Sequence, residues 1–201
     1  MKSDFDEAKL SLWFRVILLA AFCTIIGAIG KQQSEYNALA HAYHEYRVGA
    51  EHEIESLEVA LDSTSKQAKK AVFVQKETEC LAKNIYFEAG MEPYAGMLAV
   101  ATVTKNRVQN KEYPKTYCGV VYQKHNSSCQ FSWTCDSRND RIRNSIAYQK
   151  ATKIAEDVLL KGKRSGIIDR NVMFYHADYI TPYWAASKDA VTKIGTHIFY
   201  R

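Results

Sequence analysis

Glycine and proline are scarce in this chain, which has only 9 Gly and 3 Pro among its 201 residues. Both residues mark the frequent turns of β-sandwiches and barrels, so their scarcity argues against a loop-rich all-β protein. The sequence has no Gly-rich phosphate loop, and His41, His44 and His52 match no zinc motif such as H-E-x-x-H. We therefore expect no cofactor and no metal site. With 47% hydrophobic residues, the composition also excludes a wholly disordered chain.

Charge is unevenly distributed along the chain. Residues 1–79 carry 9 Lys or Arg and 12 Asp or Glu, whereas residues 80–201 carry 18 and 10. A basic body favours an anionic partner, which nucleic acid, an acidic wall polymer or a membrane surface could each provide. Charge alone does not distinguish these partners.

A hydrophobic segment stands near the N-terminus. Val16–Gly30 contains no charged residue, and Arg15 directly precedes it. A spanning helix needs about 20 apolar residues and a terminal Arg can reach the interface, so residues 1–30 are predicted to hold a single-pass membrane anchor. A cleaved signal peptide is the alternative, because Ala28-x-Gly30 loosely resembles a cleavage site. More basic residues before the segment than directly after it favour a body outside the cytoplasmic membrane, in the periplasm or cell wall.

Residues 31–76 are predicted to form a helical linker. Ser34–Lys76 is polar and lacks Pro, and its apolar residues recur at spacings of three and four. This periodicity is typical of an amphipathic helix, either a stalk or a coiled coil, and residues 34–62 are the candidate for self-association. Ser63–Ser65 is expected to interrupt the helix. The recurring apolar positions are Leu39, Tyr43, Tyr46, Ala50, Ile54, Leu57 and Leu61.

The body, residues 77–201, combines helical patterns with short strand patterns, which predicts an α+β domain. Helices are expected over Cys80–Ala89 (ended by Gly90), Pro93–Val108 and Ile142–Leu160. The last helix should turn Ile142, Ile146, Ile154, Val158 and Leu159 inward. Strands are expected over Asn171–Tyr175 and in a hairpin of Val191–Ile194 and His197–Tyr200 around Gly195-Thr196.

A carboxylate falls on the core-facing stripe of the first of these helices. Leu81, Ile85 and Glu88 are spaced so that they share one face. A carboxylate in such a place needs a chemical role or a partner. Desolvation raises its pKa, so it can hold a proton near neutral pH, as the general acid of a glycosidase does. A structural pair between Glu88 and Arg107 is the alternative from this pattern.

Residues 80–201 carry a series of motifs in a fixed order. They are Phe87-Glu88-Ala-Gly-Met-Glu92-Pro93, Gly96-Met-Leu-Ala-Val-Ala101, Asn106-Arg107-Val108, Val120-Val121-Tyr122-Gln123, Cys129-Gln130-Phe131-Ser132-Trp133-Thr134-Cys135-Asp136, Phe174-Tyr175-His176-Ala177-Asp178-Tyr179, Pro182-x-Trp184 and Ile194-Gly195-x-His197-x-Phe199. This series resembles the SleB-type (spore-cortex-lytic) cell wall hydrolase family. It departs from the family pattern at Gly90-Met91, where an Arg-Gly or similar pair is usual.

The resemblance implies a peptidoglycan-cleaving domain that acts on the glycan strand between N-acetylmuramic acid and N-acetylglucosamine, with no nucleic-acid partner. It implies a lysozyme- or lytic-transglycosylase-like fold, with helices around a cleft and a small antiparallel sheet. Glu88 matches the family's catalytic acid/base and Glu92 its second acidic position. Because the sequence offers one strong carboxylate, we hypothesise a lytic transglycosylase, in which the C6 hydroxyl of muramic acid replaces a second carboxylate, over simple hydrolysis.

Aromatic side chains in the loop-like segments of the body suit a sugar-binding cleft, because rings stack on sugar faces. Core packing is the alternative for each of them taken singly. His176 is given a supporting role only, and Asp136 and Asp178 are either second carboxylates or loop-holding residues. The candidate substrate-binding residues are Gln130, Phe131, Trp133, Tyr175, His176, Tyr183 and Trp184.

Four of the five cysteines lie in the body, and the fifth, Cys23, lies in the hydrophobic segment. Four cysteines allow three disulfide connectivities. A Cys129–Cys135 bond would close a short loop, which leaves Cys80–Cys118 as the second pair. Reduced buried thiols are the alternative, and the spacing matches neither a zinc ribbon nor a C-x-x-C redox site.

Two other functions are compatible with the sequence. A Cys–His peptidase or amidase of the wall would use Cys80 as nucleophile with His125 or His176. A membrane-tethered wall-binding protein would keep the fold without turnover. The intact motif around Glu88 argues against this last function.

Overall fold

The computed structural model describes residues 3–126, 128–136 and 141–201. It divides into two compact units, Met1–Ser65 and Lys66–Arg201. The first unit is entirely helical in its described residues, and the second combines helices with two small antiparallel sheets. The α+β fold class expected from the sequence is confirmed. The second unit begins within the predicted linker, residues 31–76.

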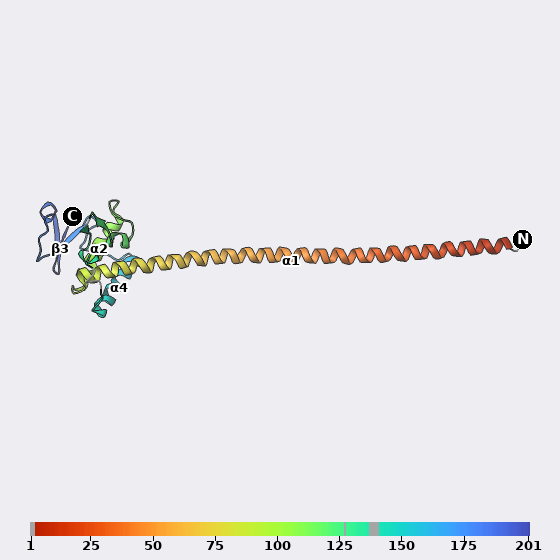
Figure 1. Cartoon of the computed structure of the whole chain (residues 1–201), viewed down its shortest axis with the longest axis horizontal. Coiled ribbons are helices and arrows are strands. Elements are labelled where there is room, and N and C mark those ends of the chain that lie inside the picture. Colours follow the sequence, from red (N-terminus) through yellow and green to blue (C-terminus); the bar gives the residue numbers. More distant parts are fainter. Residues whose placement is uncertain (1–2, 127, 137–140) are drawn as a thin grey trace. The chain divides into compact units, whose positions relative to one another are not determined.

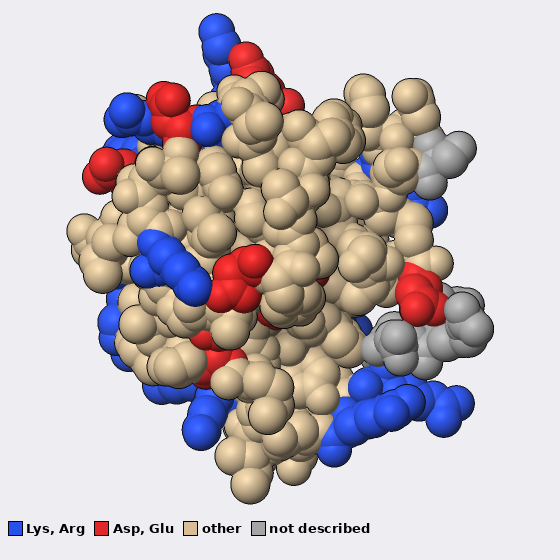
Figure 2. Space-filling model, turned by 90° about the vertical axis from the view of Figure 1, so that its left-hand side faces the viewer, with Lys and Arg blue, Asp and Glu red and all other residues tan. Residues whose placement is uncertain are grey.

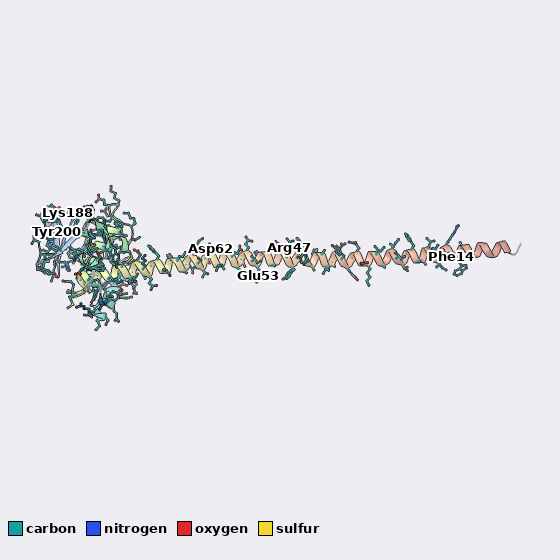
Figure 3. The ribbon with its side chains drawn as sticks, in the orientation of Figure 1. Phe14, Arg47, Glu53, Asp62, Lys188 and Tyr200 are labelled. Carbon is teal, nitrogen blue, oxygen red and sulfur yellow. A yellow bond between two sulfur atoms is a disulfide. The ribbon has the colours of Figure 1, made fainter. Side chains whose placement is uncertain are left out.

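Helix α1 runs over Ser3–Ala89, so it supplies the whole first unit and the first element of the second. Its apolar part, from Leu12, is long and hydrophobic enough to cross a membrane. No residue of its most apolar stretch is buried. Side chains along it, such as Phe14 and Glu53, project away from the helix (Figure 3). An exposed apolar surface of this kind is what a membrane anchor presents to lipid.

The expected interruption of the helix at Ser63–Ser65 is wrong. The hydroxyls of Ser63 and Thr64 both donate to the carbonyl of Ala60, at 2.8 Å each, inside a continuous helix. Such hydrogen bonds to the preceding turn allow hydroxyl side chains to sit within a helix. Because α1 continues without a break to Ala89, the expected short helix Cys80–Ala89 is the last part of α1 and not a separate element.

The last turns of α1 are tied to the short helix α3 (Tyr117–Val121). The Glu77 side chain is buried, and its Oε2 accepts the backbone N–H groups of Tyr117 and Cys118 at the start of α3. A disulfide joins Cys80 to Cys118. The end of α1 is thus fixed to the start of α3 in two ways. The Glu77 carboxylate binds free N–H groups of α3, and a covalent bond lies beside it.

Helices α2 (Tyr94–Gln109) and α4 (Ser145–Leu160) pack with the end of α1 around one core. Helix α1 ends at Ala89 and is followed by Gly90, where a side chain would overlap the Tyr86 carbonyl that accepts the Gly90 N–H. Helix α4 begins three residues later than expected, because Asn144 caps it by accepting the Ala147 N–H. The core includes Leu81, Ile85, Val100, Val103, Ile154, Val158 and Phe199.

Of the residues expected on the inner face of α4, Ile154 and Val158 are buried. The inward positions expected for Ile142 and Ile146 are wrong, because Ile142 precedes the helix and Ile146 is 65% exposed in its first turn. The helical face turned to the core therefore begins only at Ala147.

The larger sheet has the strand order β3-β5-β4, all antiparallel, and lies beside helix α2 (Figure 1). Its strands are β3 (Phe174–Ala177), β4 (Ala190–Ile194) and β5 (His197–Tyr200). The hairpin expected around Gly195 is confirmed, and Gly195 has the positive φ of 59° that a tight turn requires. The expected strand Asn171–Tyr175 is shifted, since β3 begins at Phe174.

The smaller sheet pairs β1 (Lys124–His125) with β2 (Ser128–Cys129) and leads into the 3-10 turn η1 (Ser132–Thr134). A second 3-10 turn, η2 (Ala185–Ser187), precedes β4. The structure contains a second disulfide, Cys129–Cys135, so the four body cysteines are paired and not reduced. One face of the second unit carries mostly uncharged residues, with acidic side chains near its middle and most of its Lys and Arg towards the edge (Figure 2).

Candidate active site

A cleft of about 770 Å³ opens in the second unit where the end of α1, the η1 loop and the β-sheet meet. This volume lies within the range of about 300–1,000 Å³ that is typical of ligand sites. Its walls are largely aromatic, and Glu88 is the one carboxylate among the described residues that line it. The aromatic lining residues are Phe87, Phe131, Phe174, Tyr175, His176, Tyr179, Tyr183, Trp184 and His197.

Glu88 stands in the last turn of α1, on the face that begins with the core residues Leu81 and Ile85. Its side chain is partly buried, and the Tyr175 hydroxyl donates to its Oε2 at 3.2 Å. Burial raises the pKa of Glu88 to about 7, although the Tyr175 hydrogen bond and the charge of Arg107 act in the opposite direction. Near neutral pH, Glu88 therefore holds a proton part of the time.

Arg107 reaches the cleft from α2 and is only 3% exposed. Its Nε donates to the Met173 carbonyl at 2.8 Å, and its guanidinium lies 5.5 Å from the centre of the Phe131 ring. Its Nη1 is buried and has no hydrogen-bond partner among the residues that the structure describes. The Arg107 charge favours the ionised form of Glu88, while the hydrogen bond to the Glu88 carboxylate comes from Tyr175.

Glu92 does not line the cleft in the described part of the chain. Its Oε1 accepts the backbone N–H of Thr196 at 3.1 Å and the Thr196 hydroxyl, and lies 3.7 Å from Nδ1 of His197. A side chain on Gly195 would overlap the Glu92 carboxylate. Burial lowers the pKa of His197, while the negative charges of Glu92 and Asp178 oppose this shift. Glu92 thus holds the β4–β5 turn.

Six of the seven expected substrate-binding residues line the cleft: Gln130, Phe131, Tyr175, His176, Tyr183 and Trp184. Trp133 lies elsewhere, stacked on Phe87 with 4.6 Å between ring centres. His176 has both ring nitrogens in contact with hydrogen-bonding groups, at 2.9 Å from the Ala177 carbonyl and 2.8 Å from the Tyr200 hydroxyl. These contacts hold the His176 ring in place, and its supporting role stays a prediction.

The sequence did not single out Phe87, Phe174, Lys188 or His197 as lining residues. Lys188 lies 4.3 Å over the centre of the Phe174 ring, and it is labelled with Tyr200 in Figure 3. Phe174 and His197 belong to the sequence motifs that begin at Phe174 and Ile194, but those motifs did not predict a role for either residue. Neither Asp136 nor Asp178 lines the cleft in the described residues, and Asp178 forms an ion pair with Lys193 at 2.6 Å.

The cysteine chemistry considered from the sequence has no nucleophile in this structure. Cys80 is bonded to Cys118, so it has no free thiol. Among the residues that the structure describes, no group of three or more His, Cys, Asp or Glu is arranged to hold a metal ion. Glu88 is the one carboxylate among the described lining residues of the cleft, and its pKa is influenced by Tyr175 and Arg107.

Comparison with known proteins gives a consistent result. The spore cortex-lytic enzyme of Bacillus cereus (strain ATCC 14579) is 27% identical over 128 residues, which cover 63% of this chain and 45% of that protein. That of Oceanobacillus iheyensis is 28% identical over 133 residues, covering 63% and 42%. The chain thus spans less than half the length of these curated relatives.

The solved catalytic domain of the germination-specific lytic transglycosylase SleB from Bacillus anthracis is 29% identical to this chain. The similarity covers 63% of this chain and 95% of that domain, with a TM-score of 0.51. The model of the Cell Wall Hydrolase family matches residues 91–200, which begin three residues after Glu88. With more than half of its length matched by this model, the chain belongs to the cell wall hydrolase family.

Proposed function

We propose that the second unit cleaves the glycan strand of peptidoglycan between N-acetylmuramic acid and N-acetylglucosamine, as a lytic transglycosylase with Glu88 as its general acid and base. The observation that carries this proposal is a single carboxyl group with a pKa of about 7 in an aromatic-walled cleft of about 770 Å³. Aromatic side chains suit the apolar faces of sugar rings, and a protonated carboxyl suits a glycosidic oxygen.

In the first step, protonated Glu88 gives its proton to the glycosidic oxygen as the bond from the muramoyl anomeric carbon breaks. Because the Tyr175 hydroxyl donates a hydrogen bond to Oε2 of Glu88, we assign proton transfer to the substrate to Oε1. The resulting carboxylate is stabilised by the same hydrogen bond and by the charge of Arg107. A group with a pKa near neutrality suits this exchange, since it can both give and accept a proton at that pH.

In the second step, the C6 hydroxyl of the same muramic acid attacks its anomeric carbon and Glu88 accepts the hydroxyl proton. A 1,6-anhydro bond forms, and the enzyme returns to its protonated state. Simple hydrolysis would ordinarily use a second carboxylate as nucleophile or base. Glu88 is the one carboxylate among the described lining residues, and Glu92 is engaged by Thr196, so intramolecular attack is favoured. The similar SleB domain of Bacillus anthracis is a lytic transglycosylase, which supports the same choice.

Digestion of purified cell walls in ¹⁸O-water tests the mechanism. The full-length protein, solubilised in detergent, should release muramoyl ends without the label, with masses of anhydro products. Incorporation of ¹⁸O at the new muramoyl end would mean that water attacked, and the transglycosylase proposal would be wrong. A failure to clear a wall suspension at all would instead favour a wall-binding protein without turnover.

We also propose that α1 anchors the protein in the cytoplasmic membrane by residues 1–30, with the catalytic domain, within residues 77–201, outside. The exposed apolar surface of the helix and the wall substrate of the family both support this placement. Protease added to intact spheroplasts should digest the body of the protein. Complete protection until lysis would contradict this orientation.

Self-association through residues 34–62 is part of the same proposal. Three apolar side chains on this part of α1, Leu39, Tyr46 and Leu61, are at least 70% exposed in the single chain. Pairing with the same face of a second copy would remove them from water. Chemical crosslinking of the detergent-solubilised protein should give a dimer, and Leu39→Glu with Leu61→Glu should abolish it. A monomer at all concentrations would reject this role.

A further inference from the structure

A second cavity, of about 380 Å³, lies next to the cleft and shares Phe87 with it. Phe87 directly precedes Glu88 in α1, so the residue that lines both cavities is the chain neighbour of the proposed general acid. This volume is at the lower end of the range for small-molecule sites, about 300–1,000 Å³, and suits a short branch better than a run of sugars. A ligand that extends from the cleft past Phe87 would enter it.

The walls of this cavity are held in place by specific contacts. Phe87 and Trp133 stack with 4.6 Å between ring centres, and Trp133 Nε1 donates to Asn84 at 3.4 Å. On the opposite side, the Tyr86 hydroxyl accepts the backbone N–H groups of Arg143 and Asn144, at 3.0 Å each. The segment that carries the arginines is therefore fixed to α1 through its backbone.

The charge of the lining is positive. Arg141 and Arg143 both line the cavity, and no Asp or Glu is among its described lining residues. Asn144, the N-cap of α4, and Ala147, in its first turn, line it too, so the positive end of the dipole of this helix adds to the same field. Two guanidinium groups, each able to bind a carboxylate through paired hydrogen bonds, point to an anionic ligand.

We propose that the cavity bounded by Phe87, Trp133, Arg141 and Arg143 binds the carboxylate-bearing peptide branch of the wall strand whose glycan occupies the cleft. This inference rests on the proposed function for the identity of the polymer. N-acetylglucosamine carries no charge, whereas the lactyl group of muramic acid carries a peptide with free carboxylates. If the muramic acid lies at Glu88, its peptide branch can extend past Phe87, which lines both the cleft and the cavity of the two arginines.

The test uses full-length protein in detergent with Glu88→Gln, so that no ligand is cleaved during the measurement. Calorimetry measures the affinity of three probes: a muramoyl disaccharide with its tetrapeptide, the same compound with its peptide carboxylates amidated, and the disaccharide with a free lactyl carboxylate. We expect the first probe to bind roughly tenfold more tightly than the second, and this difference to shrink at high salt.

Arg141→Gln with Arg143→Gln should abolish the preference for the charged tetrapeptide. Lys111→Gln with Lys150→Gln removes the same charge from exposed positions outside the cavity and should keep the preference. Equal binding of the charged and amidated peptides, or a preference that survives the arginine substitutions, would overturn the inference. Binding of the free lactyl compound as tight as that of the tetrapeptide would also overturn it, since the lactyl carboxylate would then be the ligand.

These outcomes are separate from those of the cleavage experiment. Binding is measured with an enzyme that cannot transfer a proton from residue 88, so a peptide preference does not depend on the bond that is cleaved. Conversely, active cleavage without ¹⁸O uptake, combined with no peptide preference, would leave the proposed function standing and reject the branch site alone.

Discussion

Glu88→Gln should abolish wall cleavage while preserving the fold. The amide has nearly the same shape as the carboxyl group and can still accept the Tyr175 hydroxyl, but it cannot deliver a proton. Loss of a general acid typically lowers the rate by about 10²–10⁴-fold. The decisive part of the prediction is that the same substitution should also change stability in a pH-dependent way.

The size of this stability effect follows from the pKa of Glu88, which burial raises from 4.5 to about 7. Each pKa unit corresponds to about 1.4 kcal/mol, so ionisation of the folded protein at this side chain costs up to about 3 kcal/mol relative to the unfolded chain. The contribution of the protonated group is fully present below pH 4.5 and is lost as the pH rises through 7. Gln does not titrate, so the variant escapes this loss.

The assay is the free energy of unfolding of wild type and Glu88→Gln in detergent at pH 4 and at pH 8, with the disulfides intact. Between these two pH values, the difference should move in favour of the variant by about 2–3 kcal/mol. Parallel pH dependences would refute the reasoning, because Glu88 would then titrate like an exposed carboxyl group.

Glu92→Gln is the matched control for activity. It makes the same change in a carboxylate that accepts hydrogen bonds from Thr196 instead of lining the cleft. It should destabilise the protein by about 1–2 kcal/mol and keep activity within about tenfold of wild type. If a folded Glu92→Gln protein is as inactive as Glu88→Gln, the assignment of a single catalytic carboxylate is wrong.

Three further variants test other contacts of the second unit. Tyr175→Phe removes a hydrogen bond that lowers the pKa of Glu88, so the alkaline limb of the pH–rate profile should move to higher pH; an unchanged limb would contradict this contact. Gly195→Ala should lower stability by more than about 2 kcal/mol in thermal unfolding, because the residue has a φ of 59° and an added methyl would meet a buried carboxylate; near-native stability would reject the close packing. Replacing both Cys80 and Cys118 with Ser should cost about 2–4 kcal/mol but leave cleavage intact, whereas a cysteine-dependent hydrolase would be inactive.

The sequence predicted those features that depend on local periodicity. The helical spacing of Leu81, Ile85 and Glu88 indicated a carboxylate on a core-facing stripe, and the structure has that stripe at the end of α1. The hairpin around Gly195 was predictable because the turn requires a positive φ. In both cases the determining residues are close together in the sequence.

Features that depend on distant partners were not predictable in this way. Glu77 is buried because it caps a helix that begins 40 residues later, and nothing in its own segment distinguishes it from the exposed glutamates before it. Trp133 was expected in the cleft but stacks on Phe87 and lines the second cavity. Its position depends on this packing contact, which its motif does not reveal. The helix continues through Ser63–Ser65 because the hydroxyl groups of Ser63 and Thr64 donate hydrogen bonds to a carbonyl of the preceding turn.

The two glutamates of the Glu88–Glu92 motif illustrate how a turn can divide similar residues between different tasks. On a continuous helix they would share a face, and a pair of carboxylates would suggest an acid and a base. The break at Gly90 instead directs Glu92 to the turn of a hairpin 104 residues away, where it accepts the Thr196 N–H. The next residue, His197, packs edge-on against Tyr175 at 5.4 Å, and Tyr175 donates to Glu88. Glu92 is thus linked through packing contacts to Glu88, the proposed acid, and a structural role for Glu92 is compatible with the proposed mechanism, in which only one of the two carboxylates of the motif transfers a proton.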